Sequence, residues 1–189
     1  DILESGKFLD PKTSVKEIAI GYLLSDHDGP LFVLIKDWKF FKDNYNTYLK
    51  PVSEKVGKID KAELYVNGKK VCDVKLIEGS AGPNLMTLLQ QNQIQYAVAG
   101  TPPFVSAIDK ASSAVDIKIL APIMMNGSGL LVADDAPADD WDSFVAWIKE
   151  RSAEGKPVVI ADPQNGSIQD VQLKEALDSA GIGYSTKSA

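Results

Sequence analysis

The sequence predicts an α/β fold with a mostly parallel β-sheet flanked by helices. Four segments, 21–35, 74–90, 95–108 and 158–173, run from a strand-like stretch through a turn rich in Gly, Ser, Pro or Asn into a helix-like stretch. Such turns lie at the carboxyl ends of parallel strands, where the next helix directs free backbone N–H groups into the space above the sheet. We therefore expect several of these turns to hold a small polar molecule without a catalytic side chain.

Composition and charge narrow the class of protein. The chain has 189 residues, enough for one full domain or two small lobes, and 44% of them are hydrophobic. The net charge is −6 and no stripe of Lys and Arg is present, which argues against nucleic acid as the main partner. The only cysteine, Cys72, excludes an internal disulfide and a metal site of several cysteines.

The first half of the chain predicts a strand, a helix and a hairpin. Residues 17–24 alternate like a buried strand, and a helix is expected from Asp28 to about Phe41 because Pro30 is tolerated in a first turn. We interpret 42–60 as a short helix and a loop. Two further strand-like runs, within 62–77, flank Asn67-Gly68, which is typical of a type I′ hairpin turn.

The second half predicts three more helices and four strands. The expected strands are 95–100, 116–125, 129–134 and 157–163. Helices are expected to begin at Thr101 and Asp140, each as an N-cap, and the last helix at Ser167 or Asn165.

Turn-rich and acidic stretches suggest how the chain is divided. We expect an N-terminal tether over 1–16, a first lobe over 17–128 that includes the hairpin 62–77, and the hinge and start of a second lobe over 129–189. The chain ends soon after a helix without a closing strand, so the second lobe is expected to be incomplete.

The order of these pieces resembles a known family. The matching stretches are IGYLLSDHDGPLFVLIKDWKFF, LIEGSAGPNLMTLLQQNQIQYAVAGTPPFVSAI, ILAPIMMNGSGLLV and VVIADPQNGSIQDV, within about residues 17–182. The chain is similar to the solute-binding proteins of ABC importers for nitrate, taurine, alkanesulfonates and thiamine-pyrimidine precursors, which have a type II periplasmic-binding-protein fold. It departs from them in a longer loop and hairpin over 45–72, and complete members continue beyond this C-terminus.

The resemblance implies a receptor without chemistry of its own. A small solute would sit between two lobes, and the closed form would dock on an ABC permease in the membrane. It implies no cofactor and no metal, and a periplasmic or lipid-anchored location, with any signal segment outside this chain.

The expected solute-binding residues lie in five turns. Each turn also has a purely structural interpretation as a helix cap or a tight turn, and Asp28 in particular is equally well explained as a helix cap. The only histidine, His27, has no neighbours at a spacing that favours a metal site or a Ser-His-Asp relay. The expected residues are Ser25, Asp26, His27, Asp28, Ser80, Ala81, Gly82, Gly100, Thr101, Pro102, Asn126, Ser128, Asn165, Gly166, Ser167 and Gln169.

The charges of these turns suggest a class of solute. None contains Lys or Arg, and a helix N-terminus attracts an anion by about 0.3–1 kcal/mol when exposed. Asp26 and Asp28 favour a cation or a proton donor instead. A zwitterion such as an aminosulfonate would satisfy both. The three tryptophans, Trp38, Trp141 and Trp147, are interpreted as helix-packing residues.

Two other functions fit the same fold. One is an enzyme acting on a small metabolite, although the Cys-rich iron motif of the yeast-type pyrimidine enzyme is absent. The other is the ligand-sensing module of a regulator. Residues 1–16 are too short and polar to supply a DNA-binding helix-turn-helix before it.

Overall fold

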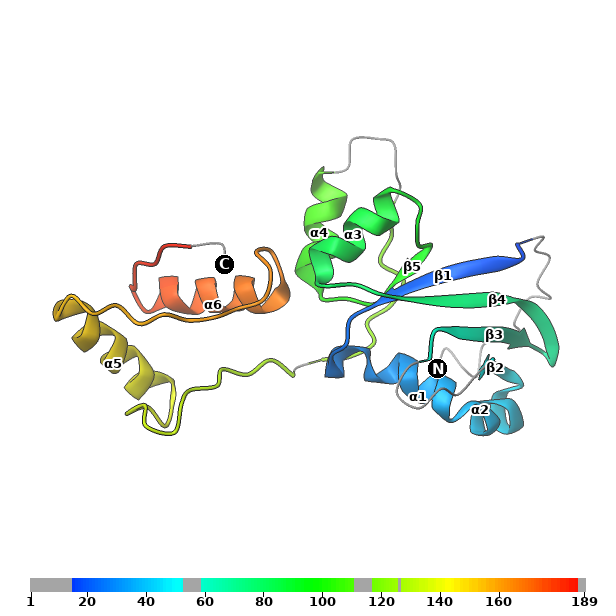
Figure 1. Ribbon diagram of the computed structural model, residues 1–189, viewed down its shortest axis with the longest axis horizontal. Coiled ribbons are helices and arrows are strands. Elements are labelled where there is room, and N and C mark those ends of the chain that lie inside the picture. Colours follow the sequence, from blue (N-terminus) through cyan, green and yellow to red (C-terminus); the bar gives the residue numbers. More distant parts are fainter. Residues whose placement is uncertain (1–14, 53–58, 111–116, 126, 187–189) are drawn as a thin grey trace. The chain divides into compact units, whose positions relative to one another are not determined.

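The chain forms two compact units, residues 1–125 and 126–189. The structure is a computed structural model that describes residues 15–52, 59–110, 117–125 and 127–186 (Figure 1). The first unit contains β1 (Glu17–Tyr22), the 3-10 turn η1 (Asp26–Asp28), α1 (Gly29–Lys36), α2 (Trp38–Tyr45), β2 (Thr47–Pro51), β3 (Lys61–Val66), β4 (Lys69–Glu78), α3 (Gly82–Gln90), β5 (Tyr96–Ala97) and α4 (Thr101–Lys110). The second contains α5 (Trp141–Ala153) and α6 (Ile168–Ser179).

The five strands of the first unit form one mixed sheet in the order β2-β3-β4-β1-β5. β1 lies between β4 and β5 and pairs with both in parallel, whereas β2, β3 and β4 pair antiparallel. The expected hairpin joins β3 to β4, and both turn residues, Asn67 and Gly68, have positive φ (52° and 73°), as a type I′ turn requires.

Helices cover both faces of this sheet. Side chains at positions of opposite parity in a strand point to opposite faces. Tyr22 of β1 packs with Leu31 and Ile35 of α1, whereas Ala19 of the same strand packs with Leu85 of α3 and with α4. α1 therefore lies on one face and α3 and α4 on the other, as Figure 1 shows.

The second unit is built around the packing of α5 on α6. Its buried apolar cluster contains Phe144, Ile148 and Leu177. Asp140 caps α5 as expected, because its Oδ1 accepts from the Ser143 N–H at 2.8 Å while the Ser143 Oγ accepts from the Asp140 N–H at 3.1 Å. This reciprocal pair is a capping box.

Several expected elements differ in the structure. The helix expected to run to Phe41 is broken at Asp37 into α1 and α2. The stretch 42–60, interpreted as a helix and a loop, contains the strand β2. Thr101, the expected N-cap, is the first residue of α4.

The strands expected at 116–125, 129–134 and 157–163 are wrong for the part of them that the structure describes. Those residues carry no strand assignment, although they contain runs of apolar side chains. A strand exists only where a neighbour pairs with its N–H and C=O groups, and within the described residues these segments have no such ladder.

Candidate functional site

Three strand-to-helix turns of the first unit end at the same edge of the sheet. Tyr22, the last residue of β1, is in register with Glu78, the last residue of β4, and Gly21 is in register with Ala97, the last residue of β5. Because the three strands run parallel, the turns that follow them emerge side by side. This edge is where α/β proteins of this kind bind ligands, at the point where successive helices pass to opposite faces.

The turn after β1 is held by a buried carboxylate. Asp28 is 0% exposed, and its Oδ2 accepts a hydrogen bond from the Leu23 N–H at the end of the strand. No side chain caps α1. Asp28 therefore closes the loop 23–28 and does not present its carboxylate to solvent, whereas Ser25 and Asp26 of the same loop are exposed.

Burial changes the acidity of this group. It raises the pKa of Asp28 from 3.8 to about 6, although the Leu23 hydrogen bond and the neighbouring His27 act in the opposite direction. The second carboxylate oxygen, Oδ1, and the His27 Nε2 are both buried without a hydrogen-bond partner among the described residues. The turn therefore contains two polar groups whose hydrogen bonding is unfulfilled.

The turns after β4 and β5 pack against each other. A Cβ on Gly82 would lie 2.6 Å from the Cγ of Pro103, so only glycine allows α3 to begin this close to α4. Ala81 and Gly82 are buried, while Ser80 and Thr101 are exposed. The Ser80 N–H donates to the Asn84 Oδ1 at 3.2 Å. Gly100 and Pro102 are half-buried.

The turn before α6 in the second unit is occupied by its own side chains. Ser167 caps the helix, as its Oγ accepts from the Asp170 N–H at 3.3 Å. The Asp170 carboxylate accepts from the Gly166 N–H at 2.7 Å and pairs with Lys174 at 2.6 Å. Lys174 also donates to the Asn165 Oδ1 at 2.7 Å. Asn165, Gly166 and Ser167 are thus engaged in one local network.

A cavity of about 400 Å³ with a mainly apolar lining and a few polar side chains lies in the same unit. Two expected residues, Ser128 and Gln169, line it, while Asn126 lies outside the described residues. Trp141, Asp162 and Gln172 also line it, and sequence reasoning missed them. The sequence held a signal for two of them. Gln172 lies one turn after Gln169 on α6, and Asp162 directly follows the apolar run 158–161.

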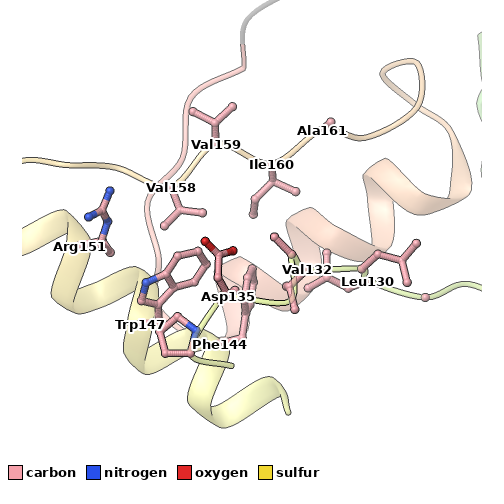
Figure 2. A pocket seen from close by; sticks show the side chains of 15 residues that line it. Leu130, Val132, Asp135, Phe144, Trp147, Arg151, Val158, Val159, Ile160 and Ala161 are labelled. Atoms are coloured by element: carbon pink, nitrogen blue, oxygen red, sulfur yellow. The ribbon is translucent and has the colours of Figure 1, made fainter. Parts of the chain in front are cut away.

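An adjoining cavity of about 670 Å³ has a lining of mixed polar and apolar surface. Leu130, Val132, Trp147 and Ile160 are among its lining residues. Figure 2 shows the Asp135 carboxylate pointing into this space, with Arg151 beyond Trp147. Two further residues that line it, Leu131 and Val159, are 94% and 92% exposed.

The turns of the first unit offer hydrogen-bonding groups to a polar solute. Within the described residues no group of three or more His, Cys, Asp or Glu side chains is arranged to hold a metal ion. In the same part of the chain no helix is long and apolar enough to cross a membrane. Free helix N-termini, hydroxyls and amides can hold a polar solute by hydrogen bonds.

The open five-stranded sheet flanked by helices, with its turns at one edge, is that of a periplasmic-binding-protein-like α/β fold. The model of the NMT1-like family matches residues 11–187, and the chain belongs to this family. This match confirms the resemblance to solute-binding proteins.

A curated relative is the uncharacterized protein MJ1180 from Methanocaldococcus jannaschii. It is 33% identical over 114 residues, which cover 60% of this chain and 76% of the relative. No solved structure matches the chain.

Proposed function

We propose that this protein is an extracytoplasmic receptor that captures a small polar, anionic or zwitterionic solute between two lobes and delivers it to an ABC importer. The observation that carries the proposal is the convergence of the turns after β1, β4 and β5 at one sheet edge. Membership in the NMT1-like family supports the same role. The hinge would lie near 126–137.

The exposed groups at this edge suit reversible binding. Ser25, Ser80 and Thr101 offer hydroxyls beside the N-termini of helices, and Asp26 offers an exposed carboxylate. A solute that contacts both lobes would stabilise the closed form, because a ligand shifts an equilibrium by its differential affinity for the two states. No covalent step is needed, and we propose none.

The first experiment is native mass spectrometry of the full chain, followed by calorimetry with taurine, a short alkanesulfonate, nitrate and an aminopyrimidine. We expect one of these solutes to bind, and Thr101→Ala to weaken its binding by about tenfold if one hydrogen bond of typical strength is lost. Thr87→Ala removes an equally exposed threonine hydroxyl from α3 and serves as the matched control. Failure of every solute to bind, or equal effects of the two variants, would refute the proposal.

A further inference from the structure

The 400 Å³ cavity of the second unit has an unusual combination of lining groups. Its volume lies within the range of small-molecule sites, which are usually a few hundred Å³. Trp141 lines it while remaining 39% exposed, so part of an aromatic ring is available to a ligand. Asp162, Gln169 and Gln172 provide a carboxylate and two amides on the same lining.

The charge balance around this cavity is negative. The neighbouring carboxylate of Asp170 forms an ion pair with Lys174 at 2.6 Å and accepts a hydrogen bond from the Gly166 N–H. Among the described residues Asp162 forms no ion pair of its own. Burial and a hydrogen bond that the Asp162 carboxyl donates to Asp170 raise the pKa of Asp162, while nearby Lys174 acts in the opposite direction.

The N-terminus of α6 does not offset this charge. Its Gly166 and Asp170 N–H groups are used by the side chains of Asp170 and Ser167. An anionic ligand group in the cavity would therefore meet two acidic side chains, Asp162 and Asp170, that share one lysine, and a helix end that is already occupied. A cation would meet a carboxylate and could lie against the face of an indole, and both of these attract it.

We infer that the cavity lined by Trp141, Asp162, Gln169 and Gln172 binds an organic cation, the ammonium-bearing end of the solute. Asp162 pairs with the positive charge, Trp141 contacts the alkyl groups around it, and the two amides accept or donate hydrogen bonds to neighbouring polar atoms. As an assignment of one end of the transported solute, this inference rests on the proposed function. The cation site itself is testable without it.

Choline and its neutral isostere 3,3-dimethylbutan-1-ol are the probes, because they share a shape and differ in charge. We expect calorimetry on the full chain to detect choline and not the alcohol. Asp162→Asn should weaken choline binding by about tenfold or more, and Trp141→Leu by roughly three- to tenfold. Glu175→Gln, which removes an exposed charge from the same helix α6, should leave it unchanged.

Each outcome bears on the inference. Equal binding of choline and the alcohol, no binding of choline, or equal effects of Asp162→Asn and Glu175→Gln would overturn it. Circular dichroism of each variant establishes that the second unit remains folded, and Trp141→Phe, which keeps an aromatic ring, should retain most of the affinity.

The two proposals fail separately. One possible result is that a solute from the first panel binds, Thr101→Ala weakens its binding, and choline does not bind. This result would support the receptor function and refute the cation site. If choline binds through Asp162 while no solute depends on Thr101, the cation site stands and the proposed function falls.

Discussion

At the residue scale, Asp28 illustrates how one carboxylate can have two local targets. An Asp before Gly-Pro is a plausible helix cap, yet Pro30 has no N–H, which removes one of the two donors that a cap normally uses. The carboxylate accepts instead from the Leu23 N–H at the end of β1. The sequence could therefore predict that Asp28 organises this turn, but not which backbone group it would bind.

The raised pKa of Asp28 makes stability depend on pH. The pKa of the Asp28 carboxyl rises from 3.8 to about 6 on folding. The protonated carboxyl therefore contributes to the stability of the folded state in full at pH values below 3.8. This contribution is lost as the pH rises through about 6, the pKa of Asp28 in the folded state. We expect Asp28→Asn, which stays neutral, to reduce the loss of unfolding free energy between about pH 4 and about pH 7, by about 3 kcal/mol at most. Urea unfolding at both pH values measures it.

Asp26→Asn is the control for this prediction. Asp26 is exposed and lies in the same loop, so its removal should leave the pH dependence of the unfolding free energy close to that of the natural chain. Parallel pH profiles of the natural chain and Asp28→Asn would show that Asp28 is not the group responsible.

At the element scale, the packing of α3 on β1 depends on the absence of a side chain at Gly21. A Cβ there would lie 2.5 Å from the Ile94 Cδ1 and 2.8 Å from the Leu85 Cδ2, both in the buried cluster on that face. Both contacts are with the ends of flexible side chains, so the core would have to repack but could do so. Overpacking of this kind typically costs about 1–3 kcal/mol.

Gly21→Ala should therefore lower the unfolding free energy by about 1–3 kcal/mol, measured by urea unfolding. Gly29→Ala is the matched control, because a Cβ on Gly29 meets nothing within 4 Å and alanine favours the helix that Gly29 begins. Equal stabilities of the two variants would contradict the close approach of α3 to β1.

The elements also show where sequence patterns sufficed and where they did not. Asn67-Gly68 and Asp140 predicted a hairpin and a helix start because their signals are local. β2 was missed because TYLKP carries Lys and Pro at an edge and becomes a strand only by pairing with β3. The strands predicted at 129–134 and 157–163 were wrong for the converse reason. These segments have the composition of strands, but within the described residues no neighbouring strand pairs with them.

The candidate site was predictable to a similar extent. The positions of the turns after β1, β4 and β5 could be predicted because Gly and Pro residues mark where each strand-like stretch ends and the next helix begins. The cavity-lining roles of Trp141 and Asp162 did not, because they depend on which surfaces α5 and α6 leave uncovered.

At the scale of the whole molecule, the two units have separate and unequal cores. The first has two buried clusters, whereas the described cluster of the second consists of Phe144, Ile148 and Leu177 with partly buried neighbours. Small cores bury less apolar surface for each residue that is ordered. We therefore expect residues 126–189 to unfold at a lower urea concentration than the first unit.

Tryptophan fluorescence separates the two transitions. Trp38→Phe leaves Trp141 and Trp147, which report on the second unit, and the double variant Trp141→Phe/Trp147→Phe leaves Trp38, which reports on the first. The two variants should give different unfolding midpoints. Coincident midpoints would show that the chain unfolds as one cooperative body.

The close contact between Gly82 and Pro103 has a consequence for motion. Because the Pro103 side chain of α4 lies directly against Gly82 at the start of α3, neither helix can tilt without displacing the other. The polar groups at the starts of these helices are thus carried on one stiff block. In the receptor that we propose, adjustment to solutes of different size would have to come from the loop 23–28 or from the approach of the opposite lobe. Variants that recognise a larger solute should therefore be sought there rather than where α3 and α4 meet.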